Sequence, residues 1–300
     1  MKLSIIKFYS RNFLVSALSW AFMLQLPAPQ MPGNGLPSAA IPKKIVWRCV
    51  ESDDRTAELA RNYTYDQRVV RKHFDSHGEV KSIHIKTWEI INLFGESYSR
   101  LIQRDDKPLS AGEETKEQEK LEKFFNKLRR ESENERQKRQ AKEKKQRDEE
   151  RAYLHDIVNA YDFRIVGEEA LDGRDVWVIE ATPTKNFHPT QPHANLLSKI
   201  TGKAWIDKQD YGWVKVEGEA IDTIPLALFL ARIHKGTRFD LERVRLNNEI
   251  WLKHRFHVEA KARVLLLSNR SIELESTFSN FKKFSTTTKI LPEVREAEPK

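Results

Sequence analysis

The sequence predicts a mainly β protein with helices, an α+β fold built on one antiparallel sheet. The first reason is the stretch Tyr161 to Lys185, where two runs rich in β-branched residues flank the tetrapeptide Leu171 to Arg174. Its central Asp-Gly pair tolerates the positive φ of a tight turn, so the stretch is predicted to be a β-hairpin. The second is that strand-like runs follow one another as far as Phe284, and the third is a similar meander between Tyr63 and Gln103.

The N-terminus has the features of an export signal. A basic leader with Lys2, Lys7 and Arg11 precedes an apolar run of 14 residues, Phe13 to Leu26, and small residues at 38–40 offer a cleavage site. The run is shorter than the ~20 residues that a membrane span needs. We therefore predict a secretory signal peptide over residues 1–40 and a periplasmic location, with an uncleaved membrane anchor as the alternative.

Cysteine usage and charge exclude several classes. Cys49 is the only cysteine, so no intramolecular disulfide can form, and the preceding Val46-Trp47-Arg48 is unlike a lipid-attachment motif. We expect Cys49 to act as a small buried apolar residue. The net charge of +8 is spread thinly along the chain, which argues against nucleic-acid binding and permits peripheral contact with an anionic membrane surface.

The N-terminal half begins with a helix and three strands. Ser52 to Arg55 has a capping-like arrangement that predicts a helix ending near Asn62, with Leu59 facing inward. Strands follow from Tyr63, over Glu79–Phe94 and over Ser97–Gln103, the first two joined by a turn at residues 75–78. Three strands and a short helix bury little surface alone, so we assign them to the same sheet as the C-terminal strands.

Residues 110–151 are predicted to form a long charged helix that interrupts the domain. Ser110 and Glu113 have the spacing of a capping box, and no Gly or Pro follows for some 40 residues. Glu–Lys and Glu–Arg pairs at i,i+4 support the helix. The apolar residues of its first third share one face and should dock: Leu121, Phe124, Phe125 and Leu128.

No apolar face remains from Arg129 to Arg151, which predicts a solvated spacer. The alternative is that the helix of residues 113–151 binds an envelope protein partner. Apolar residues then recur at helical spacing and should return the chain to the sheet: Leu154, Ile157, Val158 and Tyr161.

The C-terminal half is predicted to run from hairpin to hairpin. Strands are expected over Arg174–Thr182, Lys203–Asp207, Trp213–Asp222, Thr237–Leu246, Ile250–Ala260 and Ser271–Phe284. Apolar and polar residues alternate in the last two, which indicates a sheet with a single covered face. Residues 224–233 are apolar without a clear period and fit a strand, a short helix or a flap over the core.

Catalytic and metal-binding patterns are missing from the sequence. His254 and His257 lie three apart on a predicted strand and so face opposite sides, and the remaining histidines fall in turns and loops or stand alone. No nucleophile, phosphate-binding or dinucleotide-binding motif occurs. We predict no enzyme activity, no metal and no cofactor. An exported sheet rich in aromatic and aliphatic residues indicates instead a protein that binds something apolar.

Several segments together resemble a known superfamily. They are residues 51–103, IVGEEALDGRDVWVIEATP at 165–183, GKAWIDKQDYGWVKVE at 202–217 and NNEIWLKHRFHV at 247–258. With them the chain resembles the periplasmic lipoprotein-carrier superfamily of LolA-like carriers, LolB-like receptors and RseB-type envelope-stress regulators. In particular, it looks like exported bacterial proteins described as outer membrane lipoprotein-sorting proteins.

The resemblance implies a curved antiparallel sheet that forms an incomplete β-barrel, with helices packed in or over its mouth. It also implies a hydrophobic cavity for acyl chains and no catalysis. The domain would cover residues 41–284, with the helical insertion at 110–151 as a departure from the usual carrier, and a C-terminal tail at 285–300. The hairpin at 161–185 is predicted to be a central strand pair, because both of its faces carry apolar residues.

Cavity candidates follow from residue type and strand parity, with ordinary core packing as the alternative for each. They are Trp177, Ile179, Trp205, Val214, Val216, Phe229, Phe239, Trp251, Phe256 and Phe278. The expected function is non-catalytic binding of acyl chains or lipoproteins, in outer-membrane lipoprotein sorting or lipid transport. The alternative is an envelope-stress regulator or scaffold that uses the charged helix to bind a protein.

Overall fold

The computed structural model of the protein describes residues 40–75, 77–93, 96–191, 194–226, 231–264 and 268–283. The predicted signal peptide, apart from Ala40, and the predicted tail at 285–300 lie outside these residues. Within the described part, no helix is long and apolar enough to cross a membrane.

Helices and strands alternate in blocks along the chain. The helices are α2 (Ala40–Ala60), α3 (Ala111–Arg129), α4 (Glu133–Ala160) and the 3-10 helix η1 (Ala194–Lys199). The strands are β1 (Tyr63–Phe74), β2 (Val80–Leu93), β3 (Glu96–Arg104), β4 (Lys107–Pro108), β5 (Tyr161–Leu171), β6 (Arg174–Pro183), β7 (Ile200–Asp207), β8 (Trp213–Ala220), β9 (Ile224–Leu226), β10 (Ala231–Ile233), β11 (Arg238–Leu246), β12 (Ile250–Val264) and β13 (Ser268–Lys283).

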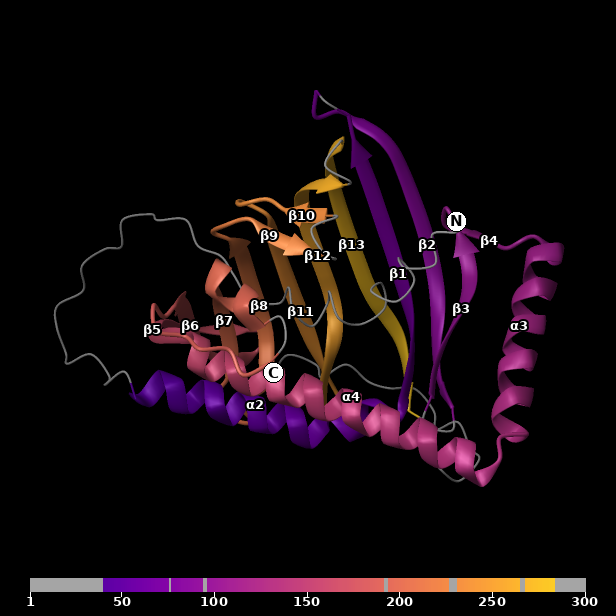
Figure 1. Ribbon diagram of the computed structural model, residues 1–300, viewed down its shortest axis with the longest axis horizontal. Coiled ribbons are helices and arrows are strands. Elements are labelled where there is room, and N and C mark those ends of the chain that lie inside the picture. Colours follow the sequence, from indigo (N-terminus) through magenta and orange to yellow (C-terminus); the bar gives the residue numbers. More distant parts are fainter. Residues whose placement is uncertain are drawn as a thin grey trace.

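One curved antiparallel sheet organises the fold (Figure 1), with the order β4-β3-β2-β1-β13-β12-β11-β8-β7-β6-β5. Because β4 and β5 end this order at opposite edges, the described sheet is open, which confirms the prediction of an incomplete barrel. The N-terminal meander β1–β3 belongs to the same sheet. It joins through the last strand, since β1 pairs with β13 from Tyr63 opposite Lys283 to Phe74 opposite Ser271.

The hairpin β5–β6 forms around the predicted turn. Asp172 and Gly173 have φ angles of 50° and 73°, the positive values that Asp-Gly tolerates. The prediction of a central strand pair is wrong, because β5 is an edge strand of the sheet. The apolar residues on both faces of β6 have a different cause. Val176 and Val178 pack in a small cluster on one face, and Ile179 packs in the main core on the other.

Helix α2 begins twelve residues earlier than predicted. Its inner stripe is Ile45, Val46, Cys49 and Val50, all buried in the main core, a spacing that places them on one face of a helix. The prediction for Cys49 is confirmed, and burial raises the pKa of its thiol. Leu59 also packs against the core, as predicted.

The charged segment forms two helices, so the prediction of one uninterrupted helix is wrong. Its second helix, α4, starts at a capping box in which the Ser132 hydroxyl accepts a hydrogen bond from the Glu135 N–H, and Glu135 reaches back to Ser132. Two orphan amides are satisfied there, so the chain can stop and restart helix without Gly or Pro.

Both helices return to the sheet through apolar residues, as predicted. In α3, Leu121 and Leu128 are buried, and the Phe124 ring lies 4.8 Å from the ring of Tyr98 on β3. In α4, Ile157 and Val158 are buried in the main core. Helix α4 lies beside α2, and the two cross the same side of the sheet (Figure 1).

The stretch at 224–233 forms a strand where it is described. Ile224–Leu226 and Ala231–Ile233 pair with each other as β9 and β10, and β10 also pairs with β12. The strand alternative is therefore confirmed for these six residues.

The face of the sheet opposite the main core carries a cross-strand ladder of charges. Lys72 Nζ lies 3.0 Å from Glu273, whose carboxylate is 3.5 Å from His257 Nε2. On its other side, His257 Nδ1 lies 3.1 Å from Asp240, which also accepts a hydrogen bond from Arg255 at 2.7 Å. These residues alternate with core residues such as Phe256 and Leu274, so the predicted wet face is confirmed.

The His257→Gln variant is expected to lose about 1 kcal/mol of unfolding free energy at pH 5.5 and much less at pH 9. The hydrogen bond with Asp240 raises the pKa of His257 against the effect of burial; Arg255 also opposes the rise, and Glu259 adds to it. Because the pKa of His257 is higher in the folded protein than in the unfolded protein, where it is about 6.5, the full stabilisation is present at pH values below about 6.5. The stabilisation is lost as the pH rises through the pKa of the folded protein. Urea unfolding at both pH values measures the loss. His77→Gln, in an exposed turn, is the control. A loss in His257→Gln that does not change with pH would contradict the prediction.

Candidate binding site beneath helix α2

The ten candidate residues do not line a single cavity. Six belong to the main core on the helix-covered face: Trp177, Ile179, Val216, Phe239, Phe256 and Phe278. Trp205 and Val214 lie with Val176 and Val178 in the small cluster on the other face, and Trp251 packs against it. Phe229 lies outside the described residues. Both faces of the hairpin are thus covered, as strand parity predicted.

Most of these side chains are tightly packed. Ile179 is completely buried and Val216 is 2 % exposed, which leaves no room for a ligand beside them in this conformation. Trp205 donates its indole N–H to Glu169, and the Lys215 ammonium lies 4.8 Å from the centre of its ring. Of the candidates in the described part of the chain, Trp251 and Phe278 contribute to the wall of a pocket.

That pocket lies between the C-terminal half of α2 and the sheet, and has a volume of about 290 Å³. We call it the α2 pocket. Its apolar wall comes from α2, β1, β12 and β13: Ala57, Ala60, Tyr65, Ile250, Trp251, Leu252, Phe278 and Phe281. The Tyr65 ring lies 5.8 Å from each of the rings of Phe278 and Phe281, so three aromatic rings line it together.

One ion pair joins helix to sheet at this pocket. Arg243 of β11 donates to both carboxylate oxygens of Asp53 on α2, at 2.5 and 3.2 Å. Burial opposes the charge on Arg243, but Asp53 outweighs it and raises the pKa of the guanidinium. Sequence reasoning missed this pair. The signal was strand parity: every second position of one predicted strand carries Phe239, Leu241 and Arg243. Arg243 therefore shares a face with two apolar residues, and a buried cation needs an anionic partner.

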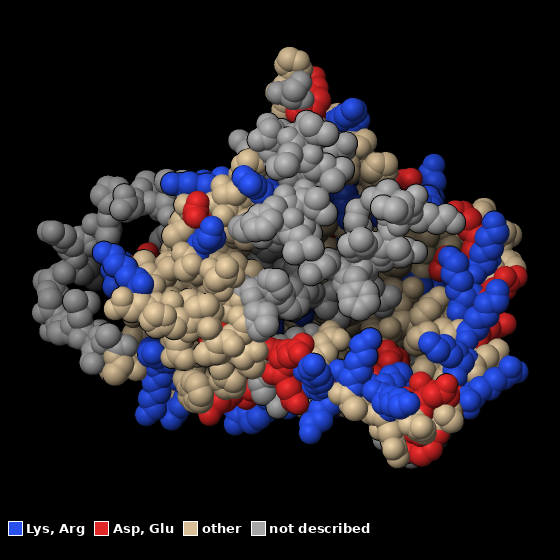
Figure 2. Space-filling model, in the orientation of Figure 1, with Lys and Arg blue, Asp and Glu red and all other residues tan. Residues whose placement is uncertain are grey.

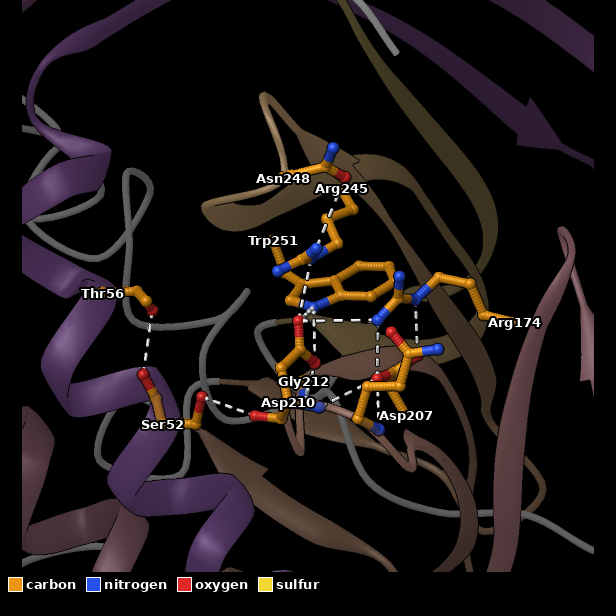
Figure 3. Close-up of polar contacts among 10 residues, drawn as sticks. Ser52, Thr56, Arg174, Asp207, Asp210, Gly212, Arg245, Asn248 and Trp251 are labelled. Atoms are coloured by element: carbon orange, nitrogen blue, oxygen red, sulfur yellow. Dashed lines mark hydrogen bonds and ion pairs between the residues drawn. The ribbon is translucent and has the colours of Figure 1, made fainter. Parts of the chain in front are cut away.

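A second polar network fixes the middle of α2 to the β7–β8 turn (Figure 3). Ser52 Oγ donates to the backbone carbonyl of Asp210 at 3.0 Å. The Asp210 carboxylate accepts from Trp251 Nε1 at 3.1 Å and lies 2.8 Å from Arg245 Nε. Gly212 packs flat against this indole: an added Cβ would lie 2.0 Å from Trp251 Nε1. Any side chain there would displace Trp251.

Next to it, Asp207 forms a buried ion pair. Its side chain has no exposure, and its carboxylate accepts from Arg174 Nε at 2.5 Å and Nη2 at 2.8 Å. The backbone N–H groups of Gln209 and Asp210 also donate to it. The Arg174 guanidinium lies 5.6 Å from the ring centre of Trp251, so the ion pair and the anchor of α2 share one indole.

The described residues contain no group of three His, Cys, Asp or Glu side chains placed to hold a metal ion. The strongly bonded carboxylates at 53, 207 and 210 each face an arginine or an indole N–H. The geometry therefore supports binding in the α2 pocket better than chemistry at any of these carboxylates.

Comparison with known proteins yields matches to solved structures. No protein-family model and no curated protein matches the sequence. A structure described as an outer membrane lipoprotein-sorting protein domain, from Vibrio parahaemolyticus, is 14 % identical over 81 % of this chain and 95 % of that chain, with a TM-score of 0.32. A LolA superfamily protein from Nitrosomonas europaea is 10 % identical over 81 % and 93 %, with a TM-score of 0.28.

The Pseudomonas aeruginosa MucA/MucB complex also matches, at 9 % identity over 82 % of this chain and all of that chain, with a TM-score of 0.21. Such identities concern the fold alone. A LolA superfamily protein is thus among the solved structures to which this chain is similar.

Proposed function

We propose that the protein is an exported, non-catalytic carrier that binds an acyl chain of a lipid or lipoprotein in the α2 pocket. The observation that carries the proposal is an aromatic-walled pocket under a helix that the Asp53–Arg243 ion pair and the Ser52–Asp210 hydrogen bond hold in place. Its volume of about 290 Å³ is at the lower end of ligand pockets, which span ~300–1,000 Å³. A long chain therefore requires the C-terminal half of α2 to move outward.

The two halves of α2 differ in how firmly they are held. Ile45, Val46, Cys49 and Val50 bury the first half, whereas the side chains described from residue 51 to 60 are half-buried or exposed. Fewer buried apolar contacts mean a smaller free energy of local opening. The second half is thus the part of the helix that can open while the first half stays in the core.

The proposal includes a periplasmic location and a role in outer-membrane lipoprotein sorting or lipid transport. Its support is the basic leader and apolar run at the N-terminus, together with a pocket whose wall includes the rings of Tyr65, Phe278 and Phe281. A carrier of this kind needs no cofactor.

The Ala57→Trp variant is expected to weaken binding of a fluorescent fatty acid about tenfold or more, because the indole would fill the α2 pocket. Ala57 is exposed on its other side, so the helix can accept the larger residue. Ala111→Trp, at the exposed start of α3, is the matched control and should bind like the parent.

Mass spectrometry of organic extracts from protein purified from the periplasm should show a co-purifying lipid. Absence of any lipid, together with failure of an apolar dye to enter the α2 pocket, would refute the carrier function.

The envelope-partner alternative stays a prediction for the charged helices. Lys and Arg alternate with Asp and Glu over the region of α3 and α4 in Figure 2, and most side chains of residues 133–149 are exposed. A chain lacking residues 118–150 separates the two functions in the same assay. A carrier should keep an uncharged lipid such as monooleoylglycerol in the α2 pocket, whereas an adaptor should keep its fold and lose its partner.

A further inference from the structure

A second pocket adjoins the α2 pocket. It has a volume of about 460 Å³ and lies between Arg61, the residue after α2, and one face of α4. We call it the cationic pocket, and its wall consists of Arg61, Gln137, Arg139, Gln140, Ala141, Glu143, Lys144 and Arg147. Arg61 also lines the α2 pocket, so one side chain stands at the border between the two.

The walls of the two pockets differ in chemistry. The α2 pocket combines an apolar wall with the charged residues Asp53, Arg61, Arg243 and Lys253. The cationic pocket has no aromatic residue in its wall and presents four cations, Arg61, Arg139, Lys144 and Arg147, against one carboxylate, Glu143. Its own side chains therefore carry an excess of three positive charges.

Arg139 is already engaged in the structure. Its guanidinium lies 2.9 Å from Glu131, 3.0 Å from Glu143 and 3.6 Å from Glu96, and these contacts hold α4 against the start of β3. Arg147 also lies 3.7 Å from Glu143. We assign Arg139 a structural role, and we assign the attraction of an anion to the other cations of the wall, Arg61, Lys144 and Arg147.

We propose that the cationic pocket binds the anionic headgroup of an amphiphile whose apolar chain occupies the α2 pocket, with Arg61 between headgroup and chain. The inference rests on the proposed function and specifies its ligand class: a lipid with a phosphate or carboxylate next to an acyl chain. Guanidinium and ammonium groups form charge-assisted hydrogen bonds with such headgroups, and Arg offers phosphate a planar, bidentate fork.

Three oleoyl probes with different headgroups test the inference. The measurement is displacement of the uncharged dye N-phenyl-1-naphthylamine from the full chain by each probe. Each probe is kept below its own critical micelle concentration. The parent should bind lysophosphatidylglycerol at least tenfold more tightly than monooleoylglycerol, with lysophosphatidylcholine between them. Raising the salt concentration should reduce this preference, because the charges lie at the surface.

The variant K144Q, at a residue that lines the cationic pocket and not the α2 pocket, should reduce the preference about fivefold while binding monooleoylglycerol like the parent. Lys138→Gln, on α4 but outside both pockets, is the matched control and should keep the preference. Equal affinity of the parent for all three probes, or an equal loss in the control, would overturn the headgroup site and leave the carrier intact.

Two further outcomes are distinguishable. If inorganic phosphate alone cancels the preference at the same concentration as lysophosphatidylglycerol, the pocket is a free-anion site and the inference is overturned. If no probe displaces the dye, monooleoylglycerol included, the proposed function itself fails. A thermal melt of each variant separates loss of binding from loss of fold.

Discussion

Replacing Asp207 by alanine is expected to lower the free energy of unfolding by about 3–5 kcal/mol. The substitution removes a fully buried carboxylate that accepts four hydrogen bonds, two from Arg174 and two from the backbone of the β7–β8 turn. It leaves the Arg174 guanidinium, itself only 17 % exposed, with the more distant contact to Asp210 at 3.8 Å. Urea unfolding at pH 7 measures the loss.

Two comparisons make this prediction specific. Burial raises the pKa of Asp207, but Arg174 and two backbone amides outweigh burial and hold the pKa below its ordinary value. A lowered pKa stabilises the fold above the unfolded value, about 3.9, so the gap between parent and variant should shrink as the pH falls below it. Glu168→Ala, which breaks the nearby surface pair with Lys208, should cost less than about 1 kcal/mol. Equal losses of unfolding free energy in Asp207→Ala and Glu168→Ala would contradict the prediction that the buried ion pair contributes more than the surface pair.

Replacing Asp53 by alanine is expected to cost about 3 kcal/mol and to speed the entry of an apolar dye into the α2 pocket. The variant leaves Arg243, whose side chain is 15 % exposed, buried without its anion. Arg243→Leu should cost less, about 1–2 kcal/mol, because Asp53 is 25 % exposed and can be hydrated.

The double variant completes a thermodynamic cycle. With both charges gone, the loss should be smaller than the sum of the single losses, since neither partner remains unpaired. Stopped-flow dye entry should be fast in all three variants. Additive losses together with parental dye entry would mean that the pair does not hold the helix over the pocket.

Local chemistry allowed much of the sheet to be predicted. The turns at Asp172-Gly173 and Asn247-Asn248 have the expected positive φ values, because the preference of Asp, Asn and Gly for such angles is a property of the residues themselves. The capping box at Ser110 belongs to the same class of signal, and so does the one at Ser132. The second is hidden in a run of charged residues where every position suits a helix.

Features set by distant parts of the chain could not be predicted in this way. Strand β5 is an edge strand because no other strand pairs with its outer side in the described sheet. Its apolar residues indicate only how well its two faces are covered, and they carry no information about its pairing partners. The early start of α2 was missed because the stripe at Ile45, Val46, Cys49 and Val50 directly follows the small residues of the predicted leader.

The candidate site shows the same limit. Aromatic type identified Trp251 and Phe278 as wall residues, but a filled core and a cavity use the same residue types. Where space remains depends on how α2 lies across the sheet, and that is fixed by Asp53 with Arg243 and by Ser52 with Asp210.

The pairing of β1 with β13 sets the order in which the protein can be completed. The pairing of Tyr63 with Lys283 can form only when β13 is available, and it carries a high cost in loop entropy because the two residues are far apart in the sequence. Until then the meander β1–β3 exposes an open edge, a template for pairing with other chains. Arg68, Arg71 and Lys72 lie along β1, and such charges discourage that pairing. These charges therefore protect β1, the strand that joins the two halves of the sheet, from pairing with other chains before it pairs with β13.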